Sequence, residues 1–156
     1  MKKVTLKPIL LTASIIALSG IYAVETKIEK QPTAEMLAKD NKEAEKVLMN
    51  YLKAGDESNV EQLDKLTHKF YRVIFKDVSN NEVSEINRST YLDLIEKKVF
   101  GGNPRKVEIL ESNLSENNIA SFKVKTSSEG VIFISYFSLI NDKGSWLVLQ
   151  DLIYKK

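Results

Sequence analysis

The chain contains no cysteine and only one histidine, His68, among its 156 residues. The missing thiols exclude disulfide bonds, a cysteine nucleophile and cysteine-ligated metals. A single histidine also excludes a metal site that is built from several histidines. Carboxylates remain as ligands for calcium, but the acidic residues do not follow the spacing of an EF-hand loop. The sequence therefore predicts a protein with no metal and no cofactor.

The chain also lacks the short motifs that mark common active sites, and it has no excess of charge of one sign. There is no G-x-S-x-G turn, no phosphate-binding loop and no H-E-x-x-H helix. The 23 basic and 21 acidic residues are interleaved, as on a solvated surface. This balance provides no basic patch for a nucleic acid, so we expect no nucleic-acid partner.

The N-terminal residues have the features of a secretory signal peptide. Lys2, Lys3 and Lys7 precede an apolar run, and no acidic residue occurs before Glu25. A basic start, an apolar centre and small residues at its end are typical of such a signal, which we place at residues 1–23. The small-x-small sequence at 17–19 offers an earlier cleavage point. We expect an exported protein, periplasmic or secreted; the alternative is an uncleaved membrane anchor, because the run is long enough to span a bilayer.

The rest of the chain divides into a short polar lead, residues 24–31, and one domain, residues 32–156. Cleavage after Ala23 leaves 20 basic and 21 acidic residues, a net charge of −1. Helical spacing and capping residues predict three helices, and runs of β-branched and aromatic residues predict six strands. The helices are expected from Pro32-Thr33 to Gly55, over 60–66, and after a cap at Ser89 or Thr90; the strands are expected at 70–75, 83–86, 105–113, 119–126, 131–140 and 145–154.

Several short sequences in these elements carry a family resemblance. They are Tyr51-Leu-Lys-Ala-Gly-Asp56, Leu66-Thr-His68-Lys-Phe, Tyr91-Leu-Asp-Leu-Ile95, Tyr136-Phe-Ser-Leu139 and Gly144-Ser-Trp146-Leu-Val148. In this order they resemble the nuclear transport factor 2-like superfamily, and most of all its exported bacterial members called putative lumazine-binding. The resemblance covers about residues 42–154. It implies a cone-shaped α+β fold, in the order ααββαββββ, with helices packed on a curved, mainly antiparallel sheet.

Two positions depart from the pattern of the family that the chain resembles. Ser135 stands where the family usually has Asp before the Tyr-Phe pair, and Asp151 stands where it usually has Lys near the end of the last strand. The resemblance implies a cone that binds a ligand, without implying an established activity.

The register of the last strands follows from their turns. Both final turns, at 127–130 and 141–144, end in glycine and are expected to be G1-bulge loops, in which Ser145 pairs with Asn141. This register places Asp151 and Lys123 opposite Ser135, and Gln150 opposite Tyr136.

Alternation along the strands then sorts the side chains onto two faces. One face is expected to pack on the helices and to line an apolar ligand pocket, and the other to form a homodimer, because an exposed apolar patch usually marks an interface. The pocket candidates are Tyr71, Tyr136, Trp146, Gln150 and Tyr154. The dimer-face candidates are Lys123, Phe133, Ser135, Phe137, Leu147, Leu149, Asp151 and Ile153. The alternatives are that Tyr136 only packs in the core and that Asp151 is a surface residue beside a lysine.

His68 and Asp151 are the candidates for acid–base chemistry. A catalytic His68 needs an orienting carboxylate, which the sequence does not reveal; otherwise it forms a hydrogen bond at a helix end or in the core. Apolar neighbours would raise the pKa of Asp151 unless Lys123 reached it.

Three functions remain open on the sequence alone. The leading hypothesis is an exported dimer that binds a small apolar or aromatic ligand without turning it over. The second is an isomerase, dehydratase or hydrolase that uses His68 or Asp151 with a pocket tyrosine. The third is a structural or interaction module whose cone is filled by its own Trp146, Phe122 and Tyr136.

Overall fold

The computed structural model describes residues 33–115 and 118–156, which belong to one compact unit, Gln31–Lys156. The signal peptide and the polar lead that the sequence predicts lie outside the described residues. None of the helices in the described ranges is long and apolar enough to cross a bilayer.

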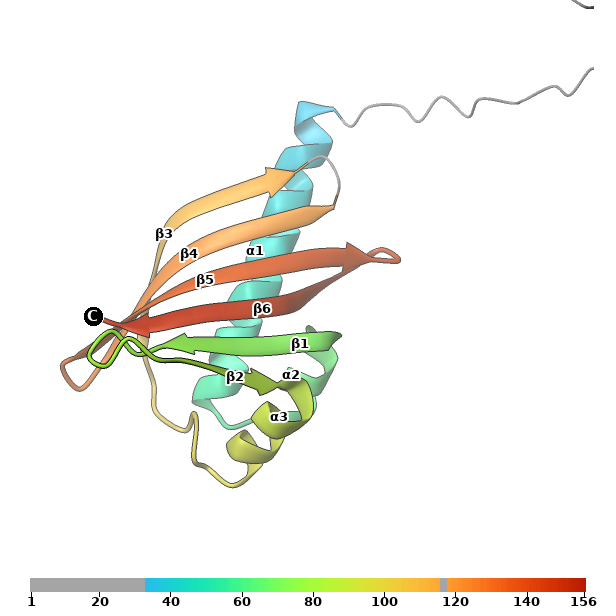
Figure 1. Cartoon of the computed structure of the whole chain (residues 1–156). Coiled ribbons are helices and arrows are strands. Elements are labelled where there is room, and N and C mark those ends of the chain that lie inside the picture. The colour runs from blue at the N-terminus through green and yellow to red at the C-terminus, as the bar shows by residue number, and fades with distance from the viewer. Residues whose placement is uncertain (1–32, 116–117) are drawn as a thin grey trace, which may run out of the picture. The chain divides into compact units, whose positions relative to one another are not determined.

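Within residues 33–115 and 118–156, three helices and six strands follow one another in the order that the sequence predicts (Figure 1). The helices are α1 (Ala34–Asp56), α2 (Val60–Leu66) and α3 (Arg88–Glu96). The strands are β1 (Thr67–Lys76), β2 (Val83–Asn87), β3 (Lys106–Ser115), β4 (Ile119–Ser128), β5 (Val131–Asp142) and β6 (Ser145–Lys155). They form one sheet in the order β2-β1-β6-β5-β4-β3, in which only β1 and β6 pair in parallel. The expected α+β class is confirmed.

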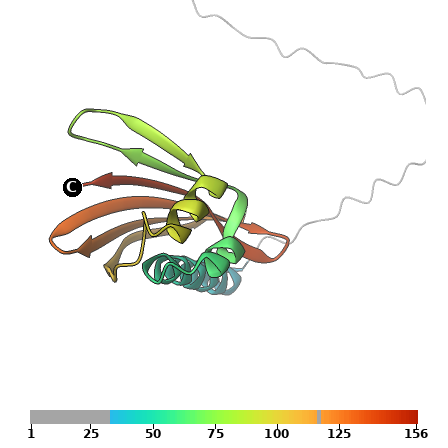
Figure 2. The ribbon, with the colours of Figure 1, turned by 90° about the horizontal axis from the view of Figure 1, so that it is seen from below.

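The long helix α1 supplies the helical side of the core. Thr33 caps it, as expected, by accepting a hydrogen bond at Oγ1 from the backbone N–H of Met36 at 3.3 Å. Ala44, Leu48 and Tyr51 recur on one side at intervals of three or four residues and are buried. All three helices lie on the same face of the curved sheet (Figure 2). We call this the helix face, and the opposite one the outer face.

The last two hairpins close with two-residue turns, so the expected G1-bulge loops are wrong. The turn residues are Glu129-Gly130, with φ of 50° and 83°, and Lys143-Gly144, with φ of 53° and 87°. Positive φ at both positions is the signature of a type I′ turn, whose twist matches that of the strands. As a result Asp142, not Asn141, pairs with Ser145, and the register moves by one residue.

A bulge in β6 moves the register by one residue more. Val148 pairs with Leu139 and Gln150 pairs with Ser138, which leaves Leu149 without a partner in the ladder. The side chains that face the helices are therefore even-numbered before the bulge and odd-numbered after it. This is why Asp151 lies opposite Phe137, not Ser135, and is buried.

The cap of α3 also differs from the expectation. Asn87, the last residue of β2, accepts a hydrogen bond at Oδ1 from the backbone N–H of Thr90 at 3.0 Å. Ser89 and Thr90, which the sequence favours as caps, lie inside the first turn. Strand β2 thus runs into the helix with no loop between them.

The loop that follows α3 is fastened to the end of α1. Arg105 donates from Nε to Asp56 Oδ1 at 2.5 Å and from Nη2 to the carbonyl oxygen of Leu52 at 3.2 Å. Gly101 has a φ of 74°, and a Cβ at this position would lie 2.2 Å from the carbonyl oxygen of Gly55. The close approach requires glycine here, and it brings Arg105 to the core beneath the helices.

Candidate functional site

Three tyrosines from different elements meet in the core with their hydroxyls in contact. Tyr51 of α1 lies between Tyr71 of β1 and Tyr91 of α3, with its Oη 2.5 Å from Tyr71 Oη and donating to Tyr91 Oη at 3.1 Å. We call this group the tyrosine cluster. Burial raises the pKa of each hydroxyl, and the charge on nearby Asp151 raises it further. The three hydroxyls are therefore neutral at physiological pH.

Asp151 lies beside this cluster and is the buried ionisable group of the β6 strand. It is only 7% exposed, and its Oδ1 has no hydrogen-bond partner among the described residues. Burial raises the pKa of this carboxyl to about 7, although a hydrogen bond with Ser135 and the charge of Arg105 act to lower it. A carboxyl with a perturbed pKa is a candidate for function. Here, however, it is enclosed by side chains, and it lines neither of the two hollows found along β1 and β2.

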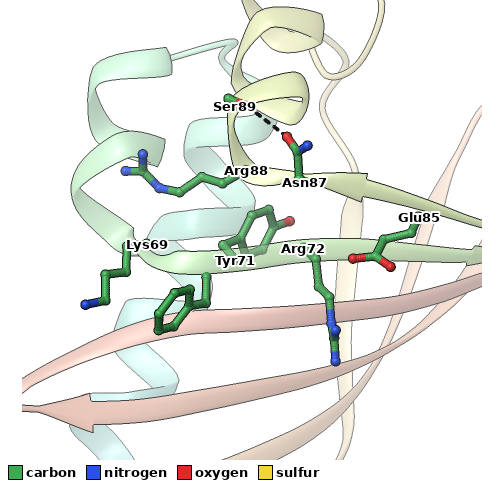
Figure 3. Close-up of a pocket in the computed structure, with 8 residues that line it drawn as sticks. Lys69, Tyr71, Arg72, Glu85, Asn87, Arg88 and Ser89 are labelled. Carbon is green, nitrogen blue, oxygen red and sulfur yellow. Dashed lines mark hydrogen bonds between the residues drawn. The ribbon is translucent and has the colours of Figure 1, made fainter.

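The larger hollow is an open groove of about 510 Å³ between β1, the end of β2 and the start of α3 (Figure 3). Its volume is in the range of small-molecule sites. It is lined by Lys69, Phe70, Tyr71, Arg72, Glu85, Asn87, Arg88 and Ser89. The second hollow, of about 430 Å³, lies farther along the same two strands.

An irregularity of β1 shapes one wall of this groove. Thr67 pairs with Val148 and Arg72 with Gln150, so residues 68–71 of β1 lie opposite Leu149 alone. We call residues 68–71 the β1 bulge. Bulges of this kind redirect side chains and occur often beside functional sites. Here the bulge leaves the ring of Phe70 69% exposed.

Tyr71 and Arg72 leave the strand at the end of this bulge in opposite directions. Tyr71 points toward α3 and Arg72 away from it (Figure 3). Tyr71 therefore belongs to the tyrosine cluster through its hydroxyl while its position on the strand borders the groove.

His68, in the same bulge, uses one ring nitrogen in a hydrogen bond and turns the other toward a carboxylate. Nδ1 accepts a hydrogen bond from the backbone N–H of Phe70 at 3.2 Å, so a proton on the neutral ring must sit on Nε2. Nε2 faces Asp142 Oδ2 at 3.7 Å. The carboxylate that the sequence does not reveal is thus present and lies on the side of Nε2. The nitrogen that would then act as a general base is Nδ1, and it already accepts the N–H of Phe70.

Comparison with known proteins identifies the family of the chain. A family model described as "Putative lumazine-binding" matches residues 39–153, most of the chain. The chain belongs to this family. No curated protein matches the chain.

Solved structures give the same fold for this family member. The chain is similar to a nuclear transport factor 2-like protein of unknown function from Shewanella baltica OS155, with 20% identity, a TM-score of 0.66 and coverage of 76% of this chain and 95% of that one. It is also similar to a nuclear transport factor 2-like protein of unknown function from Silicibacter pomeroyi DSS-3, with 13% identity, a TM-score of 0.66 and coverage of 76% of this chain and 98% of that one. A third similar structure is a ketosteroid isomerase-like protein from Erwinia carotovora atroseptica SCRI1043, with 15% identity, a TM-score of 0.60 and coverage of 79% of this chain and 98% of that one. At these identities the likeness establishes the nuclear transport factor 2-like fold alone.

The residues that the sequence predicts for the ligand pocket lie on two different faces of the sheet. Tyr71 and Trp146 are buried in the core, as expected. The corrected register puts Tyr136, Gln150 and Tyr154 on the outer face, where Tyr136 is 42% exposed. The expected contact between Tyr136 and Gln150 is absent from the ladder, because Leu152 lies opposite Tyr136.

The predicted dimer face is also divided. Ser135, Phe137 and Asp151 are buried on the helix face, and Ile153 packs against the same core. Phe133 shares this parity, whereas Lys123 and Leu147 lie on the outer face and Leu149 is the bulged residue. The expected row of Lys123, Ser135 and Asp151 does not exist. Lys123 instead pairs with Glu111 at 2.8 Å and lies opposite Tyr136.

Of the residues in the tyrosine cluster and the groove, the sequence identifies only Tyr71 as a site candidate. Tyr51 and Tyr91 were recognised as core residues, but nothing in their helical spacing indicates that their hydroxyls meet. Phe70 and Arg72 read as ordinary positions of a strand. The only signal is the run Lys69-Phe70-Tyr71-Arg72, which breaks the alternation of a regular strand. In the described ranges no three side chains of metal-ligating type lie close together.

Proposed function

We propose that this domain binds a small aromatic ligand in the groove beside the β1 bulge and does not turn it over. The observation that carries the proposal is the ring of Phe70, which is 69% exposed at the wall of a groove of about 510 Å³. Burying such a ring under a ligand contributes about 1.5–3 kcal/mol. The fold's interior, by contrast, is occupied by Phe122, Phe137 and Trp146.

Binding without turnover fits the groups that surround the groove. Nδ1 of His68 already accepts a hydrogen bond, and Asp151 does not line the groove. The lining contains Lys69, Arg72 and Arg88 but only one carboxylate, Glu85. No orienting partner for Glu85 is found among the lining residues, so the groove offers cations and an aromatic face in place of an acid–base pair.

The second part of the proposal is a homodimer formed through the outer face. The corrected register gathers apolar side chains on this face of β1, β5 and β6. They are Ile74, Tyr136, Ile140, Leu147, Leu152 and Tyr154. An apolar band across a sheet favours a protein partner, and a second copy of the chain offers a band of the same shape.

The third part is export, which rests on the basic and apolar pattern of residues 1–23. A periplasmic or secreted protein would meet its ligand outside the cytoplasm.

Native mass spectrometry of the full chain, produced in the organism that encodes it, tests these parts together. We expect a mass that corresponds to cleavage near Ala23, a dimer, and additional small-molecule mass. The same measurement on Phe70→Ala should lose the additional mass, and Val99→Ala, which trims an exposed apolar side chain in the α3–β3 loop, should retain it. Ligand mass that persists in Phe70→Ala, or none in the wild type, would contradict the groove; an uncleaved mass would contradict export.

A further inference from the structure

More cations than carboxylates line the groove, and only some of these cations already form ion pairs. Three cations and one carboxylate line it. Arg88 is committed elsewhere, because it donates to Asp64 Oδ1 at 2.8 Å and to Thr67 Oγ1 at 3.0 Å. Lys69 and Arg72, which flank Phe70, form no ion pair with any described residue.

Arg72 is held in place by an uncharged neighbour. It lies opposite Gln150 across the parallel β1–β6 pair, and its Nε donates to Gln150 Oε1 at 3.1 Å. This bond orients the guanidinium without neutralising it. Both terminal nitrogens of Arg72 are left without a partner among the described residues, in the planar fork that fits a carboxylate with two parallel hydrogen bonds.

Lys69 supplies a second cation beside the ring. Its ammonium lies 4.9 Å from the centroid of the Phe70 ring, within the range of a cation–π contact. The exposed ring therefore contacts an ammonium group, and Arg72 follows two residues farther along the same strand. Glu85 lies opposite Ile74, one pair farther along the same face than Arg72, and makes no ion pair with Arg72.

We infer that the groove selects a small aromatic carboxylate, whose ring packs on Phe70 and whose carboxylate is bound by Arg72 and Lys69. This inference rests on the proposed function, since it names the ligand class of the same groove. Gln150 is a positioning residue in this arrangement: it fixes the direction of the guanidinium and does not touch the ligand. Both groups would lose water on binding, and paired charges in a partly enclosed groove offset that cost better than a neutral ligand does.

A matched pair of probes separates the charge from the ring: 2-naphthoate and 2-naphthamide, measured by equilibrium dialysis against the full chain as it is processed in its host. We expect 2-naphthoate to bind about tenfold more tightly, the value of one charge-assisted hydrogen bond. This preference should shrink when the salt concentration is raised from about 50 mM to about 500 mM.

Three variants assign the effect to residues. Arg72→Gln should reduce 2-naphthoate binding about tenfold and leave 2-naphthamide unchanged. Gln150→Glu keeps Arg72 but neutralises it, so it should remove the preference as well. Lys46→Gln, which removes an exposed charge on α1, is the control and should change neither probe.

The outcomes distinguish the two proposals. Equal binding of both probes, weakened for both by Phe70→Ala, would overturn the inference about charge and leave the aromatic groove standing. Failure of both probes to bind, or binding that Phe70→Ala does not affect, would overturn the proposed groove itself.

Discussion

At the scale of single residues, the unusual group is Asp151. A carboxyl that is buried beside three tyrosines, with one oxygen unpaired, is favoured in its neutral form. The folded protein therefore binds a proton that the unfolded chain would release, and the stability of the domain depends on pH through this one side chain.

We predict that the wild type loses stability as the pH rises from about 4 to about 7, and that Asp151→Asn does not show this loss. The pKa of Asp151 is about 7 in the folded protein against 3.8 in the reference state. Because the folded pKa is the higher one, stability is fully present below about pH 4 and falls as pH rises through 7, by up to about 4 kcal/mol. Urea denaturation across this range measures it.

The asparagine variant should lack most of this slope and should be more stable than the wild type at pH 8. Asp40→Asn, which changes a partly exposed aspartate of α1, should keep the wild-type slope. An unchanged pH dependence in Asp151→Asn would show that Asp151 does not bind the proton.

The tyrosine cluster gives a second prediction at this scale. Tyr51 Oη contacts both other hydroxyls, at 2.5 Å and 3.1 Å. Tyr51→Phe keeps the ring but leaves two buried hydroxyls short of a partner, at a cost of about 1–3 kcal/mol each. Tyr91→Phe should cost less. Equal urea midpoints for the two variants would contradict the central position of Tyr51.

At the scale of elements, the turns and bulges decide where side chains point. Both type I′ turns use glycine at their second position, but the first positions hold Glu129 and Lys143 in the left-handed region. Side chains that are not glycine, asparagine or aspartate adopt this conformation at a cost. The turns are therefore places where the sequence is not the best one for its structure.

We predict that Lys143→Asn stabilises the domain, by several tenths of a kcal/mol up to about 1 kcal/mol, because asparagine tolerates a positive φ. Gly144→Ala should destabilise it by about 1 kcal/mol or more, since φ there is 87°. Nothing lies within 4 Å of a Cβ at Gly144, so the effect would come from the backbone alone. Thermal unfolding measures both; a neutral Gly144→Ala would contradict the left-handed turn.

The same turns and bulges explain which parts of the molecule the sequence predicts. The element order, the span of α2 at 60–66 and the Thr33 cap follow from local chemistry, and they are correct. The face of the sheet on which Asp151 lies depends on a two-residue turn and on one extra residue, Leu149. The expected G1-bulge loop and the observed two-residue turn use the same Asn-Asp-Lys-Gly sequence, and no local signal marks the bulge. Each shift reverses the faces beyond it. The residues of β5, and those of β6 after Leu149, therefore lie on the faces opposite to those expected.

The groove could not be predicted for a related reason. The β1 bulge forms where residues 68–71 face Leu149 alone, which is a property of two strands that are far apart in the sequence. The exposure of Phe70 follows from that pairing. Local propensity carries no information about it.

At the scale of the whole molecule, the outer face determines assembly in our proposal. We predict that the wild type sediments as a dimer and that Tyr136→Arg sediments as a monomer, because a cation at the centre of the apolar band would be buried without a partner. Met49→Arg, which places the same charge on α1 at a side chain that is 39% exposed, is the control. Analytical ultracentrifugation distinguishes them; a monomeric wild type would exclude this interface.

The position of β6 in the sheet bears on how the domain is made. This strand is the last in sequence, yet it lies between β1 and β5 and joins the β2–β1 pair to the β5–β4–β3 meander. During synthesis both halves must wait, each with an unpaired edge, until residues from Ser145 onward have emerged. A ribosome-bound chain that ends before this strand lacks part of the core. It also exposes two strand edges with unpaired backbone N–H and C=O groups, which can pair with other chains. Assembly of the described sheet therefore waits for β6.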